Sequence, residues 1–210
     1  MVSLGAGSYH SFAVHKNGKL YGWGLNSYGE AGVPKNFDDP QSADATLPAL
    51  VPGLDKFGMI TQIEGGAHHT IALTDKQEIL VWGRLDGAQL GIDMTKLPDE
   101  SVVKDVHGNK RILRVPTQID SLQGTSVAAG TDHSLAVSTD GKAYSTGFSA
   151  SYQTGQATED DVKTFELIDN TAVREKKLVF AGCGGQFSVL AGVAEQSHGQ
   201  VNGVPKDEKL

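Results

Sequence analysis

The sequence predicts an all-β fold built from propeller blades, and three observations support this prediction. Glycine accounts for 26 of the 210 residues, which is about 12% of the chain where about 7% is usual. Several of these glycines recur at fixed spacings in successive segments, as is typical of a repeat array. Within each segment, apolar and small residues alternate on both sides of a turn, as they do in a β-hairpin.

Three full repeats align on one histidine each, His10, His69 and His133. A glycine lies three residues before each histidine, another fourteen after it and a third twenty-two after it. In order, these glycines are Gly7, Gly24 and Gly32, then Gly66, Gly83 and Gly91, then Gly130, Gly147 and Gly155. A partial fourth copy begins near residue 181, with Gly184 and then Phe187 at the histidine position.

Each repeat predicts a hairpin directly after its histidine. Alternation over residues 11–14, 70–73 and 134–137 predicts half-buried strands. The return strands are expected over residues 20–23, 79–82 and 142–145. Asn17-Gly18 and Asp140-Gly141 favour a tight turn with positive φ, whereas Lys76-Gln77 predicts a different type of turn in the second repeat.

The stretches between the hairpins, residues 33–59, 92–126 and 156–177, are more polar and vary in length. We expect each to hold an outer pair of strands and a surface loop, with residues 115–119 as one such strand. Two inner and two outer strands make a propeller blade, and radial repetition of blades protects most strand edges. Helices are disfavoured, because each interior glycine costs a helix about 1 kcal/mol.

Composition excludes several classes of protein. The 18 Lys and Arg residues against 25 Asp and Glu give a net charge of −7, so strong direct binding of nucleic acid is not expected. No run approaches the roughly 18 apolar residues of a membrane span. The single cysteine, Cys183, cannot form an internal disulfide, and the N-terminus lacks a secretory signal, so we expect an intracellular protein.

The residue just before each anchor position is the leading candidate for a binding site. These residues are Tyr9, His68, Asp132 and Gln186. They are large, polar and different from one another, whereas their neighbours are small or regular. Core positions should be alike in every repeat and a binding surface can vary, so we expect these four residues to line a rim on one face of the disc.

The recurring residues themselves are expected to be structural. A histidine at the same place in every blade should hydrogen-bond a neighbouring strand, and the tryptophans should lie in the blade cores. The expected anchors are His10, His69, His133, Trp23, Trp82, Gly24, Gly83 and Gly147.

Enzymatic interpretations fail on geometry. Asp132-His133-Ser134 has the residue types of a catalytic triad, but adjacent strand residues point to opposite faces. His68-His69 fails as a metal pair for the same reason, and no third ligand recurs at a useful spacing. The glycines do not form a Gly-x-x-x-x-Gly-Lys-Ser/Thr phosphate loop. We therefore expect no catalytic residue, no metal and no cofactor.

The repeated motif resembles that of the regulator-of-chromosome-condensation family. It reads Gly-x-x-His-(Ser/Thr)-x-Ala-(Val/Leu), then Asp/Asn-Gly, then (Tyr/Val)-x-Trp-Gly and Leu-Gly. The resemblance covers residues 2–193 and is greatest to the C-terminal half of a fungal Ran guanine-nucleotide exchange factor. Family members form seven-bladed propellers, so the resemblance implies a partial ring of about three and a half blades. The chain would then be a fragment or truncated product, or else one half of a two-chain ring.

The expected division of the chain follows from these repeats. The partial propeller spans residues 1–193, and residues 194–210 form a polar, disordered tail. The blades are expected at residues 2–59, 60–126, 127–177 and, incomplete, 178–193.

The resemblance also implies a function. A relative of this kind promotes GDP release by stabilising nucleotide-free Ran, without covalent chemistry of its own. The resemblance places the rim residues against Ran, with His68 contributing to exchange and with Asp132 and Gln186 at functional positions; Phe187 departs from the family pattern, so no role is carried over to it. It further implies a nuclear, chromatin-associated protein, whose histone and DNA contacts lie mostly in parts absent here.

Two expectations stay open at this point. The wedge-like hairpin of the family lies in the N-terminal half, so this chain alone should bind Ran weakly and catalyse little exchange. The alternative function is a repeat-propeller interaction scaffold without exchange activity.

Overall fold

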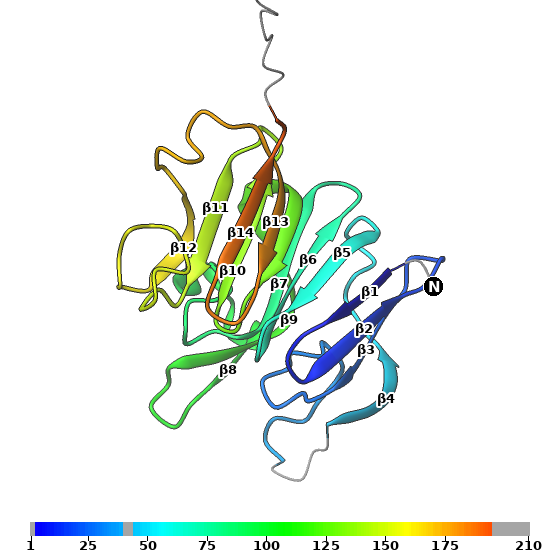
Figure 1. Cartoon of the computed structure of the whole chain (residues 1–210). Coiled ribbons are helices and arrows are strands. Elements are labelled where there is room, and N and C mark those ends of the chain that lie inside the picture. The colour runs from blue at the N-terminus through cyan, green and yellow to red at the C-terminus, as the bar shows by residue number, and fades with distance from the viewer. Residues whose placement is uncertain (1–2, 40–43, 195–210) are drawn as a thin grey trace, which may run out of the picture.

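The computed structural model describes residues 3–39 and 44–194, which fold into three four-stranded antiparallel blades and a further hairpin. The blades follow one another as a fan (Figure 1). Residues 40–43 and the expected tail from residue 195 onward lie outside the described part. No helix in the described ranges is long and apolar enough to cross a membrane.

The first blade has its strands in chain order. They are β1 (Ser3–Ala6), β2 (His10–Val14), β3 (Leu20–Gly24) and β4 (Ala45–Leu50). The β2–β3 pair is the predicted hairpin, with His10 opposite Gly24 and Val14 opposite Leu20. The innermost strand, β1, precedes the anchor histidine and pairs with β2.

The second and third blades share one long strand, β9 (Lys110–Ala129). The second blade consists of β5 (Ile60–Gly65), β6 (His69–Thr74), β7 (Glu78–Arg84) and β9 up to Gln123. The third consists of β9 from Gly124 onward, β10 (His133–Ser138), β11 (Ala143–Gly147) and β12 (Val162–Leu167). One strand thus forms the outer edge of one blade and the inner edge of the next.

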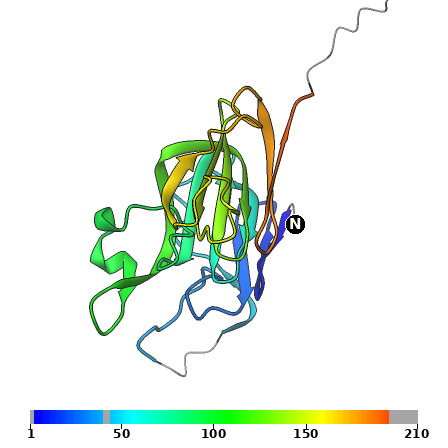
Figure 2. The same ribbon diagram turned by 60° about the vertical axis from the view of Figure 1, so that its left-hand side comes forward.

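The remaining elements are short. The last hairpin pairs β13 (Leu178–Cys183) with β14 (Ser188–Gly192). Two 3-10 turns, η1 (Met94–Lys96) and η2 (Asp99–Ser101), lead into β8 (Val102–Lys104), which pairs with β9. This segment projects from the second blade, as the turned view in Figure 2 shows.

The predicted hairpins are confirmed, and so is the predicted outer pair in stretch 92–126, where β8 pairs with β9 and residues 115–119 lie in β9. The outer pairs predicted for the other two stretches are wrong. Stretches 33–59 and 156–177 contribute a single outer strand each, β4 and β12, among the described residues. The fourth strand of each blade is instead the innermost one, which precedes the histidine. Stretch 92–126 has an additional strand beyond the outer one, namely β8 beside β9.

The turn of the second hairpin also differs from the prediction. Gln77 has φ 66°, close to the values of 83° and 82° for Gly18 and Gly141 at the same place. Its amide donates to the Thr74 carbonyl at 3.0 Å, as the two glycine amides do to their counterparts. All three hairpins therefore use one turn, and the second tolerates a non-glycine residue in the left-handed region, at a cost of about 1 kcal/mol.

The hydrophobic core lies between successive blades rather than inside each sheet. Phe12 of the first blade packs with Ile63 and Trp82 of the second, and Val81 of the second packs with Ala136 of the third. A smaller cluster joins Leu135 to the last hairpin. Strands β6 and β10 are therefore buried on both faces, which corrects the prediction of half-buried strands.

The first blade lacks such a neighbour on its outer face within the described chain. Strand β2 is half-buried, as predicted, and Leu4 is 65% exposed. Trp82 is fully buried, but Trp23 at the equivalent place is only half-buried. Trp23 thus lies at the edge of the described part, where no described blade precedes it, whereas Trp82 lies in the core between the first two blades; the anchor role of Trp23 stays a prediction.

Each anchor histidine forms a hydrogen-bonded bridge to the next blade. His10 Nε2 lies 3.0 Å from Thr70 Oγ1, and that hydroxyl donates to the Glu30 carbonyl at 2.8 Å. The bridge then recurs from His69 through Ser134 to the Gln89 carbonyl and from His133 through Ser188 to the Gln153 carbonyl. Each bridge thus joins the histidine of one blade to a loop of the same blade, through a hydroxyl side chain near the start of a strand that follows along the chain.

The glycine fourteen residues after each histidine must remain glycine. Gly83 has φ 105°, and a Cβ built on it would lie 2.6 Å from the His68 carbonyl oxygen and 2.8 Å from His69 Cα. We expect Gly83→Ala to lower the free energy of unfolding by about 3 kcal/mol or more, from backbone strain and collision together. Urea denaturation of both proteins measures the difference.

A matched control separates the two causes. Gly108 has φ 84° in the β8–β9 turn, but a Cβ there meets nothing within 4 Å. Gly108→Ala should cost only the strain, about 1 to 2 kcal/mol. Equal losses in the two variants would contradict the close packing inferred at Gly83.

The buried histidines predict a loss of stability in weak acid. Burial lowers the pKa of His10 and of His133 to about 4 and that of His69 to about 3. The unfolded chain, with ordinary histidine pKa values, takes up these protons first as pH falls below about 6.5. Each histidine should therefore remove about 1.4 kcal/mol of stability per pH unit, from pH 6.5 down to its folded pKa.

Urea denaturation between pH 7 and 5.5 tests this effect, because most carboxylates titrate below that window. Burial raises the pKa of the Glu64 carboxyl, so that group acts in the opposite direction. His133→Gln, which retains a donor for Ser188, should reduce the pH dependence by about one proton. Stability that stays flat across this window would contradict the account.

Candidate functional site

The candidate rim lies where the loops after β3, β7 and β11 meet the starts of β2, β6 and β10. Because His10 pairs with Gly24, the loop that follows this glycine leaves the sheet beside Tyr9. The Leu25 amide donates to the Tyr9 carbonyl at 2.9 Å. The same bond joins Arg84 to His68 and Phe148 to Asp132, each at 2.8 Å. Every full blade thus presents two neighbouring backbone segments on the same face.

His68 sits in an aromatic cluster made by two blades. Its ring stacks on Tyr9 at a centroid distance of 5.9 Å and lies 4.9 Å from the Tyr28 ring. Tyr9 is 61% exposed, and the His68 side chain is 25% exposed. The structure therefore brings together two of the four predicted rim residues, Tyr9 and His68, and leaves both partly exposed.

A buried carboxylate holds the inner side of the His68 ring. Glu30 Oε1 lies 3.2 Å from His68 Nδ1, and the Glu30 side chain is fully buried. Its other oxygen, Oε2, accepts from the Tyr28 amide at 2.7 Å. The Glu30 backbone carbonyl accepts from Thr70 and from the Trp82 indole at 3.0 Å. A single residue therefore joins the inter-blade bridge to the partly exposed His68.

Asp132 belongs to a network of charges that begins at Arg84. The Arg84 guanidinium lies 3.7 Å from Asp132 Oδ1, 5.5 Å from the Tyr28 ring, and bonds to Asp86. Burial opposes the charge of Arg84, but the bond to Asp86 and the nearby carboxylates outweigh it and raise the pKa of the guanidinium. Arg111 also contacts Asp86, at 2.5 Å. The rim is thus a mixed surface of aromatic rings, cations and carboxylates.

Gln186 lies apart from this cluster. It is exposed, and its amide oxygen is 3.5 Å from Ser151 Oγ. Next to it, Phe187 takes the histidine position: its ring packs against Gly184 as the histidine rings do against their glycines, but it is 60% exposed and makes no bridge. The role of Gln186 and of the other rim residues remains a prediction.

Sequence reasoning missed Tyr28, Glu30 and Arg84. Arg84 lies fifteen residues after its anchor, where the other repeats carry Leu25 and Phe148, so it varies as the rim residues do. Glu30 stands where the other two repeats have Gln89 and Gln153. These departures from the repeat pattern were the available signals. Tyr28, Glu30 and Arg84 contact residues of a second blade, and such contacts cannot be read from the periodicity within one repeat.

The triad residue types at 132–134 do not act together. Ser134 bonds to His69 of the previous blade, and His133 bonds to Ser188 of the next one. The three side chains therefore serve two different inter-blade bridges and the rim.

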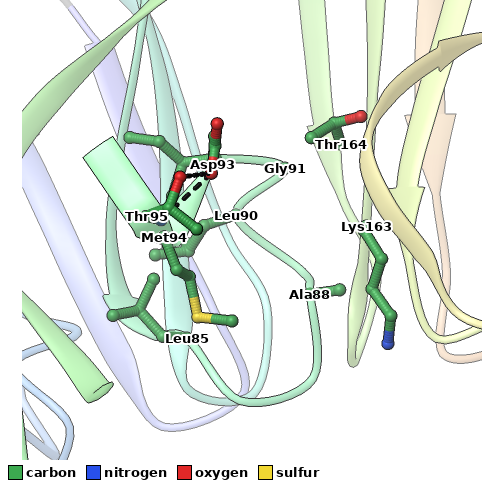
Figure 3. A pocket seen from close by; sticks show the side chains of 10 residues that line it. Leu85, Ala88, Leu90, Gly91, Asp93, Met94, Thr95, Lys163 and Thr164 are labelled. Atoms are coloured by element: carbon green, nitrogen blue, oxygen red, sulfur yellow. Dashed lines mark hydrogen bonds between the residues drawn. The ribbon is translucent and has the colours of Figure 1, made fainter. Parts of the chain in front are cut away.

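A small cavity lies beside the loop that carries Gln89. It has a volume of about 200 Å³ and is lined mainly by Leu85, Leu90, Met94 and, from β12, Lys163 and Thr164. Figure 3 shows the loop on one side and β12 on the other, with Asp93 bonded to Thr95 at its edge. Its mainly apolar lining contains none of the rim residues, so we assign it no role.

The fold defines a propeller repeat protein, and the candidate rim lies on one of its faces. Residues 1–190 match the family model of the RCC1-like domain, and the chain belongs to that family. It is 43% identical to Protein pim1 of Schizosaccharomyces pombe over the whole chain, which is 39% of that relative. It is 40% identical to the guanine nucleotide exchange factor SRM1 of Saccharomyces cerevisiae, over 90% of this chain and 39% of the relative.

A solved structure shows the same fold. Prp20p from Saccharomyces cerevisiae, described with its binding properties to Gsp1p and histones, superposes with a TM-score of 0.85 at 38% identity. The match covers 93% of this chain and 44% of Prp20p. The chain thus spans about two fifths of the length of these relatives.

Proposed function

We propose that this chain is part of a guanine-nucleotide exchange factor for a Ran-type small GTPase, and that the rim contacts the GTPase. The observation that carries the proposal is the position of His68, which two tyrosines and a buried carboxylate hold at the surface. The relatives support it, because one is named an exchange factor and another is described with its binding to Gsp1p.

Exchange of this kind needs a binding surface and no covalent chemistry. A protein that binds the nucleotide-free GTPase more tightly than the loaded form must weaken nucleotide binding by the same factor. Aromatic and arginine side chains such as those of Tyr9, Tyr28 and Arg84 are enriched among residues that dominate interface energies. The charges of Arg84 and Asp132 would favour a partner surface of complementary pattern. By the same reasoning we propose a nuclear, chromatin-associated protein, in line with the histone binding described for Prp20p.

Release of a fluorescent GDP analogue from Ran tests the proposal. We use the chain alone and a hybrid ring, in which it replaces the matching 39% of the S. pombe relative. The hybrid ring should accelerate release, and His68→Ala should slow that release by about tenfold, the loss expected for a central interface residue. The chain alone should bind nucleotide-free Ran weakly.

The matched control is His107→Ala, which removes an exposed histidine from the β8–β9 turn and should leave release unchanged. Thermal unfolding of each variant reports on folding. Normal release by a folded His68→Ala protein would remove His68 from the mechanism. A hybrid ring that neither binds nucleotide-free Ran nor releases GDP would instead support the interaction-scaffold alternative.

A further inference from the structure

Glu30 is a carboxylate where the other two repeats have a glutamine, and the structure of its loop does not require this difference. Glu30, Gln89 and Gln153 occupy one position in three equivalent loops. In each loop a side-chain oxygen accepts from the amide two residues earlier, at 2.7, 2.9 and 2.9 Å. A glutamine oxygen makes this bond as well as a carboxylate does. The second carboxylate oxygen of Glu30 must therefore serve another purpose.

The side chain at this position has a second polar atom, which takes no part in the bond to the loop amide. In the first repeat it is Oε1, 3.2 Å from His68 Nδ1. In the second repeat Gln89 Oε1 is engaged by the Gly87 amide, so the remaining atom is the donor Nε2, which is buried without a hydrogen-bond partner. The rim residue that follows is a histidine after Glu30 but a carboxylate, Asp132, after Gln89. The position thus carries a carboxylate, which accepts hydrogen bonds, in the repeat where the next rim residue is a histidine, which can donate one.

We propose that Glu30 is a positioning residue, which fixes His68 in the state that carries a hydrogen on Nδ1 and presents Nε2 to the partner. An ionised carboxylate only accepts hydrogen bonds, so the nitrogen facing it must be the donor. This holds for the neutral and for the charged imidazole, and in both states the ring lies against Tyr9 and Tyr28. Carboxylates orient metal-binding histidines in the same manner. The consequence for exchange rests on the function proposed above.

Nitrogen-15 NMR of the labelled 210-residue chain tests the positioning directly. Long-range proton–nitrogen spectra show which nitrogen of the His68 ring carries hydrogen. We expect Nδ1–H in the unsubstituted chain. A neutral ring with its hydrogen on Nε2 would overturn the proposal without the need for any variant.

The substitution Glu30→Gln then tests the cause. Its amide oxygen should keep the bond to the Tyr28 amide, as Gln89 and Gln153 keep theirs, so its NH₂ group would face His68 Nδ1. That nitrogen must then accept, and we expect the hydrogen to move to Nε2. Persistence of the Trp82 indole signal, whose N–H donates to the Glu30 carbonyl, reports that the local fold is intact.

The matched control is Gln153→Glu, which makes the opposite exchange at the same position of the third repeat. The following rim residue there is Gln186, and neither residue contacts His68. The His68 spectrum should therefore stay unchanged. An unaltered tautomer in a folded Glu30→Gln chain would overturn the proposal.

Exchange assays on the hybrid ring separate this inference from the proposed function. Glu30→Gln should slow GDP release by about threefold to tenfold, the range expected for one lost hydrogen bond, and should have no further effect in a His68→Ala background. A confirmed tautomer with no effect of His68→Ala would remove His68 from the exchange mechanism and leave the positioning intact. If Glu30→Gln moves the hydrogen of His68 but leaves GDP release unchanged, only the proposed consequence of the positioning for exchange is overturned.

Discussion

The inter-blade bridge of histidine, hydroxyl and backbone carbonyl is the interaction on which the rest of this structure depends. Its imidazole and hydroxyl lie in the interior, where polar groups need partners, and the hydroxyl satisfies two groups at once in each of three bridges. Apolar packing between blades supplies most of the stabilisation, but it is not directional. The bridges specify how each blade is aligned with the next.

The same bridge determines where the rim residues lie. The bridging hydroxyl of Thr70 is one residue beyond His69, and the rim residue His68 is one residue before it. The carbonyl that completes the bridge belongs to Glu30, whose side chain holds the His68 ring. A displacement between the first two blades would therefore change both the buried bridge and the position of the partly exposed His68. The core and the candidate site are in this respect one unit.

Local patterns in the sequence predict the hairpins well and the contacts between blades poorly. Strand alternation and the Asn-Gly and Asp-Gly turns involve residues within one repeat, so β2–β3 and β10–β11 follow from them. The innermost strand of the third blade has no such signal, because β9 runs without a break from the second blade into the third. The left-handed Gln77 was also missed, since its conformation follows from the shared hairpin geometry and not from its own preference.

The candidate site shows the same division. Comparing repeats predicts Tyr9, His68 and Asp132 as rim positions, because variation at one place in a repeat is visible in the sequence. The pairing of His68 with Glu30 joins residues 38 positions apart in different blades. Burial of Trp82 but not of Trp23 likewise depends on a neighbouring blade. These features follow from how the blades stack.

Removal of the bridging hydroxyl tests most directly whether the bridge positions the rim. Thr70→Val keeps the shape of the side chain, and Thr61→Val, which removes a hydroxyl bonded within the second blade to the Leu73 carbonyl at 3.2 Å, is the matched control. The account predicts that Thr70→Val alone shifts the His68 ring nitrogen signals and speeds hydrogen exchange of the Trp82 indole. Unchanged His68 signals in a folded Thr70→Val chain would contradict it.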